Sequence, residues 1–484
     1  MRLSLLGLDG LPPWLLRKAV DGLGLTGLSR ALRHGALLPT LSMPPITPVA
    51  WTSIATGVNP AKHGVWGFTK YYRGPKGEHL SRPYTGADVK FPRVFEDAAL
   101  RGLNLVVINY PLTWPVRAMC CLERMVVVGD TFLAPRVEFW PQGIASDLGR
   151  FFLTPSDLGD PYRRTELLVE GAMRALSGHD ADAYFIVLPF PDQAFHRDPY
   201  EVLEVGRRSA SVWESIDSLA DELMRRSTAF ILVSDHGVAT YDRCVNPLSP
   251  LIREFSVGLP RSTGGRAALG LVTLLDKVSL HLPRGASPRE LVRRGPLKWL
   301  RYFLGSHLGA VARPGSFSGG GESELAVQPF TYDAGGLSID RILYFTDEAA
   351  RSRGLQAIIG SGAGKLLKVT PLEEAFSGAY LPPYPALFIE SVNEDIYHVV
   401  STRSFAEVRR DPMPDHHIIG TTLIVGADVR ATRANIYDVA PTALSLMGLP
   451  SPRGSDGVSL VGDLGNYPYD AAVRLRGRRS VGRA

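Results

Sequence analysis

The chain has 484 residues, of which 45% are hydrophobic and 21% charged, a composition typical of a globular protein with a sizeable core. Its net charge of +5 is a small excess that is compatible with anionic substrates but does not indicate a nucleic-acid partner. The three cysteines, two of them adjacent, exclude a disulfide-rich scaffold.

Apolar segments give an expectation about cellular location. The N-terminal segment MRLSLLGLDG reaches Asp9 without a small-residue cleavage site, so it predicts a first strand and not a signal peptide. The longest apolar stretch elsewhere, Ala267 to Leu275, is much shorter than the roughly 20 residues of a membrane span. We therefore expect a cytoplasmic protein.

Short apolar runs alternate with amphipathic segments along most of the chain. A run at 3–9 precedes a helical pattern at 12–23, and a second run lies at 103–111. Helical patterns from Arg164 to Leu176 and from Ser211 to Arg225 precede apolar runs at 183–190 and 229–237, respectively. This alternation predicts an α/β fold with a mostly parallel central sheet that is covered on both faces.

The composition divides the chain into four parts. Residues 1–245 form the first part of the predicted core. Prolines, glycines and arginines accumulate in 246–335, which we interpret as an inserted cap that ends near a linker-like run at 313–324. Strand-type patterning returns afterwards, so 336–465 is the predicted second part of the core, and 466–484 is a basic tail.

Acidic and histidine residues follow, or lie near, several of the predicted strands. They are Asp9, Asp192, His196, Asp235, His236 and His416. Because an open α/β sheet places its chemistry at the carboxyl ends of its strands, we expect these side chains to converge. Carboxylates and imidazoles without thiolates are suitable ligands for divalent ions such as zinc or manganese. The pattern predicts a metallohydrolase.

Each candidate also has a plainer interpretation. Asp9 could be the N-cap of the helix that follows it, and Thr47 could be an ordinary N-cap as well. The pair Asp192 and His196 could lie on a surface helix, and Asp235–His236 could form a polar turn. His416 competes with its neighbour His417 for the role of ligand.

The order of these motifs resembles that of the alkaline phosphatase superfamily, and within it the type I phosphodiesterase/nucleotide pyrophosphatase family. The order is Asp9, then P-x-T-P-x-x-x-T-x-x-x-T-G-x-x-P-x-x-H-G around Thr47, then D-x-x-x-H, D-H-G and a late histidine. The segment IYDVAPTALSLMGLP at 436–450 is similar to the family's closing helix. The resemblance covers about 1–245 and 335–460.

The resemblance implies a fold, a metal centre and a reaction. The fold is an alkaline-phosphatase-like three-layer sandwich with an inserted cap. One metal ion, usually zinc in this group, is bound by Asp192, His196 and His416. A second is bound by Asp9, Asp235 and His236, with the oxygen of Thr47 facing both metals as the nucleophile. A phospho-threonine intermediate follows from these roles.

In related nucleotide pyrophosphatases, an asparagine binds a phosphoryl oxygen. This sequence departs from the family there, because it has Phe68 at the corresponding position. Lys70, Tyr71 and Arg73 are the nearest candidates to replace it, although a solvated basic loop is the alternative.

Besides the basic tail, the predicted cap contains a basic segment, 284–313, in which apolar residues are interleaved with the basic ones. It could contact an anionic membrane surface peripherally, or pack its apolar side on the protein itself. Its position between the two core parts suggests a lid that contributes to substrate choice.

The preferred prediction is a phosphodiesterase or nucleotide pyrophosphatase that acts on a small phosphoester or nucleotide with two divalent ions. The alternatives are a phosphomonoesterase with the same nucleophile and an inactive binding protein on the same core. The sequence predicts no specific nucleic-acid partner and no oligomeric state.

Overall fold

The largest element of the fold is a nine-stranded sheet. The computed structural model describes residues 2–245, 248–255, 323–324, 330–332, 341–361, 365–392, 396–398, 406–461 and 466–467. In spatial order the strands of the large sheet are β19 (Ala434–Asn435), β2 (Gly35–Leu41), β18 (Ile419–Val425), β9 (Ala229–Val233), β1 (Leu3–Leu8), β8 (Ala183–Leu188), β5 (Leu105–Ile108), β6 (Met125–Val128) and β7 (Phe139–Trp140).

The middle of this sheet is parallel. β1 lies between β8 and β9, and Leu3 is in register with both Ala183 and Ala229. β5 pairs in parallel with β8 and β6, whereas β18, β2 and β7 add antiparallel pairings toward the edges. Every residue of β1, β8 and β9 is buried, as expected for strands covered on both faces. The predicted mostly parallel sheet is confirmed.

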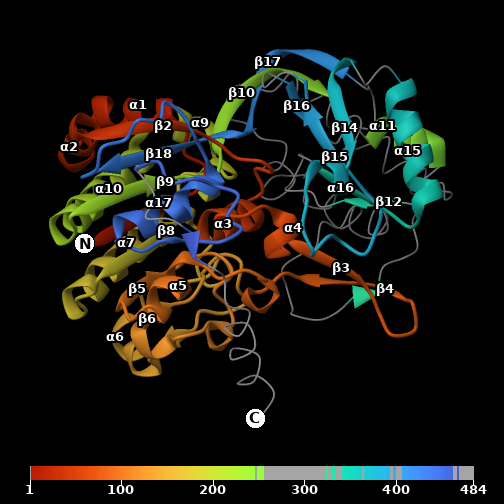
Figure 1. The fold of residues 1–484 in the computed structure, drawn as a ribbon. Helices are drawn as coiled ribbons and strands as arrows, with labels where there is room; N and C mark the ends of the chain where they lie inside the picture. The colour runs from red at the N-terminus through yellow and green to blue at the C-terminus, as the bar shows by residue number, and fades with distance from the viewer. Residues whose placement is uncertain are drawn as a thin grey trace.

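Helices cover both faces of the large sheet (Figure 1). One face packs against α1 (Pro13–Leu23), α2 (Thr26–His34), α7 (Pro161–Gly178) and α10 (Arg207–Arg226). The other packs against α3 (Thr47–Thr56), α5 (Val94–Leu100) and α17 (Val439–Leu446). The alternation along β1 explains the two cores, because Leu6 and Leu8 face the first set of helices and Leu3 and Leu5 the second. This arrangement is the predicted three-layer sandwich.

Short helices connect these elements around the edges of the sheet. They are α4 (Pro60–His63), α6 (Ala145–Leu148), α8 (Asp192–Phe195) and α9 (Pro199–Leu203).

A second group of elements lies beside the large sheet, to the right in Figure 1. It contains three smaller sheets: β16 (Ile396–His398), β10 (Gly237–Val245) and β17 (Ala406–His417); β11 (Ser323–Glu324), β4 (His79–Pro83) and β3 (Thr69–Arg73); and β12 (Phe330–Tyr332), β13 (Ile342–Phe345), β15 (Ala386–Ser391) and β14 (Leu367–Pro371). Its helices are α11 (Leu248–Phe255), α15 (Glu348–Gly360) and α16 (Leu372–Ala375). A short pair, β20 (Ser451–Pro452) and β21 (Asn466–Tyr467), follows α17.

The predicted second part of the core, 336–465, thus contributes to two places. β13, β14 and β15 belong to a four-stranded sheet of the second group, whereas β18, β19 and α17 return to the large sheet and its helices. Most of the predicted cap at 246–335, including the basic segment 284–313, lies outside the described residues, as does most of the tail at 466–484. Among the described helices, none is long and apolar enough to cross a bilayer.

Candidate metal centre and active site

Three neighbouring parallel strands end at the candidate ligands. Asp9 follows β1 directly, Asp192 begins α8 shortly after β8, and Asp235 and His236 connect β9 to β10. Because β9, β1 and β8 are adjacent and parallel, their carboxyl ends meet at the same edge of the sheet. The fold therefore brings together segments that are more than 200 residues apart in the chain, as the hydrogen bond from the Gly10 amide to Asp235 Oδ1 illustrates.

The late histidine reaches this edge through a strand pairing in the second group. β10 begins immediately after His236 and pairs antiparallel with β17, so that Val238 is opposite His416. The Tyr241 hydroxyl donates to the carbonyl of His416 at 2.8 Å. As a result, the rings of His236 and His416 lie 4.6 Å apart between centroids.

The first group of ligand atoms belongs to Asp9, Asp235 and His236. His236 Nε2 lies 3.4 Å from Asp9 Oδ1 and 3.6 Å from Asp235 Oδ2, and all three side chains are buried. The other ring nitrogen, Nδ1, is 3.0 Å from the carbonyl of Gly237. A carbonyl can only accept a hydrogen bond, so Nδ1 carries the proton and Nε2 is free to bind a cation in the neutral ring.

The second group belongs to Asp192, His196 and His416. His416 Nε2 lies 3.1 Å from Asp192 Oδ1 and 3.2 Å from His196 Nε2, and His196 Nε2 lies 3.4 Å from Asp192 Oδ2. Asp192 and His416 also offer ligand atoms within 4.8 Å of His236. The two groups therefore adjoin each other, and together they contain all six predicted carboxylate and histidine ligands; the seventh predicted ligand, Thr47, is described below.

The buried polar atoms of both groups fit divalent cations. Asp9 Oδ1, Asp192 Oδ1, Asp235 Oδ2 and His236 Nε2 are buried and make no hydrogen bond in the structure. Their contacts with one another and with His416, at 3.1 to 3.6 Å, do not have the geometry of hydrogen bonds, and a buried polar atom without a hydrogen bond costs about 1–3 kcal/mol. Cations coordinated by these atoms would remove that cost, and the O and N donor set suits zinc or manganese.

The electrostatics of the site also favour added positive charge. Burial raises the pKa of the Asp235 carboxyl well above its usual value, and the nearby Asp9 carboxylate raises it further. Burial likewise raises the pKa of Asp9. Although burial opposes it, the facing His196 ring holds the pKa of Asp192 well below the usual range. The Asp192 carboxylate in turn raises the pKa of His196 to about 8. Bound cations would take the place of the protons that this cluster attracts.

Thr47 is the first residue of α3 and is 8% exposed. The residue in the N-cap position is Ile46, and no side chain caps this helix, so the Thr47 hydroxyl is not used as a cap. The helix N-terminus offers backbone N–H groups and a favourable dipole to an anion in front of it. One turn later, Trp51 Nε1 donates to Asp9 Oδ2 at 3.3 Å. Residues four apart share a helix face, so α3 presents Thr47 on the side that contacts Asp9.

The plainer interpretations of three residues do not match their contacts. α1 has Pro12 at its N-cap and no side-chain cap, so Asp9 does not cap it. Asp192 is buried on a helix of only four residues. His417 Nδ1 accepts a hydrogen bond from the Ile419 amide at 3.0 Å, and its ring stacks on Tyr241, so it turns away from the ligands that His416 contacts.

Backbone and hydroxyl groups around the ligands fix their positions. Gly10 has φ +76°, and a Cβ there would lie 3.0 Å from Cβ of Asp192, so only glycine fits without displacing the site. The Ser234 hydroxyl donates to the carbonyl of His236 at 2.6 Å and accepts from the amide of Leu11 at 2.7 Å. These contacts tie the end of β1 to the end of β9.

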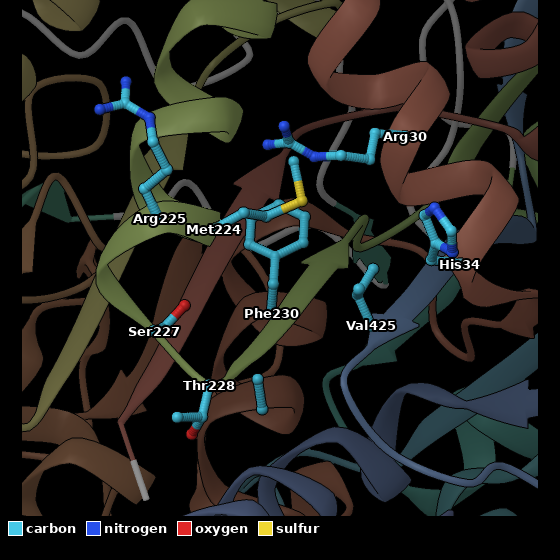
Figure 2. Close-up of a pocket in the computed structure, with 9 residues that line it drawn as sticks. Arg30, His34, Met224, Arg225, Ser227, Thr228, Phe230 and Val425 are labelled. Carbon is cyan, nitrogen blue, oxygen red and sulfur yellow. The ribbon is translucent and has the colours of Figure 1, made fainter.

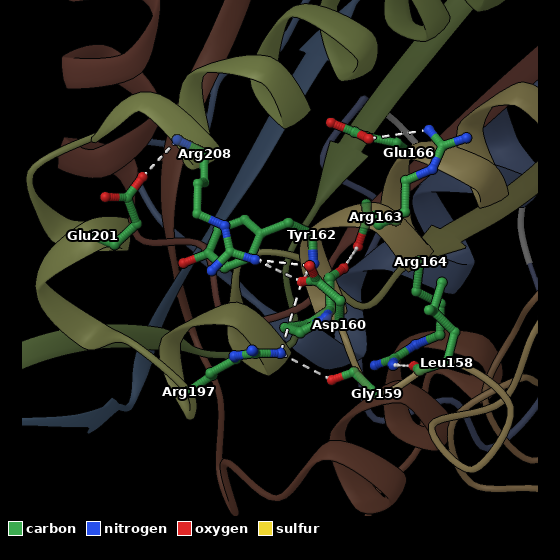
Figure 3. Close-up of polar contacts among 12 residues, drawn as sticks. Leu158, Gly159, Asp160, Tyr162, Arg163, Arg164, Glu166, Arg197, Glu201 and Arg208 are labelled. Atoms are coloured by element: carbon green, nitrogen blue, oxygen red, sulfur yellow. Dashed lines mark hydrogen bonds and ion pairs between the residues drawn. The ribbon is translucent and has the colours of Figure 1, made fainter. Parts of the chain in front are cut away.

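Several arginines make polar contacts close to the α8 segment, which carries Asp192 and His196. Figure 3 shows the contacts of Arg164 with Leu158 and of Arg208 with Asp160. Arg164 on α7 is 3% exposed, and it donates to the carbonyl of Leu158 at 2.6 Å and to the side chain of Gln193. Nearby, Arg208 donates to both carboxylate oxygens of Asp160 at 2.7 and 2.8 Å. The roles of Arg164 and Trp51 cannot be predicted from the sequence, because helical spacing does not identify their partners Gln193 and Asp9.

The three candidate substrate-binding residues lie on β3. Lys70 Nζ is 2.7 Å from Asp88 Oδ1, the Tyr71 ring lies 5.1 Å from that of Tyr344, and Arg73 donates to the carbonyl of Thr346 at 3.1 Å. These contacts hold the β3–β4 hairpin against its surroundings. A role in substrate binding stays a prediction for all three.

A cavity of about 320 Å³ lies at the opposite end of the sheet (Figure 2). Phe230 and Val425, which are paired in register near the start of β9, are among its lining residues. Two arginines at this cavity, Arg30 and Arg225, both form ion pairs with Asp221. It is separate from the metal-ligand cluster, which lies past the other end of β9.

Comparisons with known proteins agree with this architecture. Phosphonoacetate hydrolase from Sinorhizobium meliloti 1021, solved with phosphonoacetate, has 18% identity and a TM-score of 0.54, covering 92% of this chain and 95% of that one. The alkaline phosphatase PafA has 14% identity and a TM-score of 0.51, covering 95% and 99%. Human ectonucleotide pyrophosphatase/phosphodiesterase 5 has 11% identity and a TM-score of 0.50, covering 94% and 97%. At these identities the matches show the shared fold.

The sequence itself carries a family match. No curated protein sequence matched the chain. The profile described as type I phosphodiesterase/nucleotide pyrophosphatase matches residues 3–274, more than half of the chain, and this range contains Thr47 and every candidate ligand except His416. The chain therefore belongs to the type I phosphodiesterase/nucleotide pyrophosphatase family, and it is a hydrolase of phosphoric esters.

Proposed function

We propose that this protein hydrolyses phosphodiesters or nucleotide pyrophosphates through a phospho-threonine intermediate on Thr47, with two divalent ions, most simply zinc. The observation that carries the proposal is the convergence of Asp9, Asp192, Asp235, His236 and His416 into two groups that share His236, with His196 in contact with Asp192 and His416. Four of the buried ligand atoms make no hydrogen bond. The helix that begins with Thr47, α3, contacts one of these ligands directly, because Trp51 Nε1 donates a hydrogen bond to Asp9.

The roles of the residues follow from their positions. Asp9, Asp235 and His236 would hold one ion, and Asp192, His196 and His416 the other. Divalent ions bound there supply positive charge that lowers the pKa of a nearby hydroxyl and neutralises phosphoryl oxygens. The Thr47 oxygen attacks phosphorus, its hydroxyl proton is released, and the bond from phosphorus to the leaving oxygen breaks. Water then cleaves the phospho-threonine and regenerates the hydroxyl.

The first turn of α3 contributes to this step independently of the cations. Pro48 has no N–H, but the other amides of the first turn point beyond the helix end, toward a phosphoryl group bound at Thr47. This placement favours the negative charge of the phosphoryl oxygens.

The type of ester depends on how the site accommodates charge and size, because a diester and a monoester differ by one negative charge and one substituent. A direct comparison of the p-nitrophenyl ester of thymidine monophosphate with p-nitrophenyl phosphate, on zinc- or manganese-loaded protein, tests it. We expect the diester to have the larger kcat/KM. A larger value for the monoester would make the protein a phosphomonoesterase, and no turnover at full metal loading would favour a binding protein.

A further inference from the structure

Trp51 joins α3 to the metal ligands, and the reaction proposed above gives its side chain no role. Its indole Nε1 donates to Asp9 Oδ2 at 3.3 Å, while Asp9 Oδ1 is buried without a hydrogen bond and faces His236 Nε2 at 3.4 Å. The two oxygens of this carboxylate therefore have different surroundings. One is held by the indole, and the other points to the cluster.

Asp235 shows the same division of its two oxygens. The amide of Gly10 donates to Oδ1 at 3.2 Å, and Oδ2 is buried without a hydrogen bond, 3.6 Å from His236 Nε2. In each of these two carboxyl groups, an N–H group thus binds the oxygen that does not face His236: Oδ2 of Asp9 and Oδ1 of Asp235. For Asp235 the donor is backbone, but for Asp9 it is a side chain, which can be changed by mutation.

The indole is itself fixed by its packing. Trp51 is fully buried, its ring packs edge-on against Tyr110 at 5.8 Å, and the Tyr110 hydroxyl donates to the carbonyl of Trp51 at 3.1 Å. A Cβ placed on Gly7 would lie 2.5 Å from the indole, so β1, the strand that leads to Asp9, packs directly against this ring. A ring held by such packing makes a well-oriented donor.

We propose that Trp51 is a positioning residue that orients the Asp9 carboxylate for cation binding and thereby couples the position of Thr47 to occupancy of the metal site. The inference rests on the proposed two-metal function. Trp51 and Thr47 are separated by about one helical turn, ~6 Å along the axis of α3, so the contact of Trp51 with Asp9 holds the first turn of α3 close to the metal ligands. Outer contacts of this kind typically change metal affinity by about 10–100-fold.

The test is Trp51→Phe, which removes the indole N–H and keeps an aromatic ring. Trp66→Phe is the matched control, because Trp66 Nε1 is also a buried donor, at 2.8 Å from the carbonyl of Tyr380, but does not contact a ligand. Chelator competition measures the two zinc dissociation constants of each protein. We expect Trp51→Phe to weaken one of them by about 10–100-fold and Trp66→Phe to leave both within about twofold of wild type.

The possible results separate the two proposals. Wild-type affinities in Trp51→Phe, or an equal loss in Trp66→Phe, would overturn the positioning role and leave the two-metal centre in place. A wild-type protein that binds no divalent ion would overturn both. If Trp51→Phe does not fold, manganese added to wild-type protein with 15N-labelled tryptophan should broaden one indole N–H resonance first. Uniform broadening, or none, would overturn the role of Trp51.

Discussion

The Nε2 atoms of His196 and His416 lie 3.2 Å apart, although the two residues are 220 positions apart in the chain. Two ring nitrogens at this distance cannot both direct a proton at each other, so at least one of them presents a lone pair. Asp192 contacts both rings, with Oδ1 at 3.1 Å from His416 and Oδ2 at 3.4 Å from His196. A cation shared by these three side chains would satisfy all of them together.

Thr47→Ala is expected to abolish turnover while leaving the metal content unchanged. The substitution removes the proposed nucleophile, and loss of the nucleophile of a hydrolase that forms a covalent intermediate can lower kcat by about 10⁶-fold. The measurement is kcat together with elemental analysis of bound metal. Thr56→Ala is the control, because that hydroxyl lies on the same helix and donates only to the carbonyl of Thr52. Appreciable turnover by Thr47→Ala would remove the phospho-threonine from the mechanism.

Removal of metal should lower the thermal stability of the protein. Without cations, the buried carboxyl groups of Asp9, Asp192 and Asp235 keep oxygens that make no hydrogen bond, and charge on Asp9 raises the pKa of Asp235. A ligand present at 1,000 times its dissociation constant stabilises the folded state by about 4 kcal/mol, so chelation should shift the melting temperature by several degrees. Calorimetry with and without EDTA measures the shift, which should be smaller in Asp192→Asn. An identical melting temperature under both conditions would contradict a structural contribution of metal.

Arg164→Met should weaken metal binding by the Asp192 group. The variant loses the hydrogen bond to Gln193 on α8 and the one to the carbonyl of Leu158, which holds Arg164 in place. We therefore expect about a tenfold loss of zinc affinity. Arg163→Ala is the matched control, since Arg163 is half-exposed on the same helix and pairs with Glu166 at the surface. The measurement is zinc affinity by chelator competition. Equal affinities in the two variants would show that α8 does not depend on Arg164.

The buried ring of His63 predicts a loss of stability in acid. Burial lowers the pKa of His63 to about 3, and its Nδ1 accepts from the amide of Val65 while Nε2 contacts the Ser53 hydroxyl at 3.0 Å. The unfolded chain binds a proton near pH 6.5 and the folded one only near pH 3, so unfolding becomes easier as the pH falls through this window. The free energy of unfolding should fall by up to about 1.4 kcal/mol per pH unit from this group alone.

The pH dependence is tested by comparing His63→Gln with wild type between pH 7 and pH 5. The melting temperature of wild type should fall more steeply than that of the variant, because glutamine does not titrate. His34→Gln, a change at an exposed position of α2, should keep the wild-type slope. Parallel slopes for wild type and His63→Gln would exclude His63 as the titrating group.

Much of the fold could be predicted from sequence because burial leaves a strong pattern. The continuous apolar runs that became β1, β8 and β9 are typical of parallel strands, and each ends at a candidate ligand. Their adjacency then followed from the general rule for α/β sheets. The parallel sheet and the family are confirmed, whereas the metals and the role of Thr47 stay predictions.

Other features could not be predicted because they depend on packing between distant segments. The pairing of β10 with β17, which sets His416 beside His236, joins strands with no shared sequence signal. The donor contacts of Trp51 and Arg164 require particular rotamers on helices whose positions are set by the sheet. The separate four-stranded sheet of β12 to β15 was missed because its strands resemble those of the main core in composition.

Anomalous diffraction at the zinc edge, from crystals of the active protein, tests the central claim most directly. We predict two peaks, one bounded by Asp9, Asp235 and His236 and the other by Asp192, His196 and His416. Active crystals with no anomalous peak among these side chains, and none at the edges of manganese or iron, would contradict it.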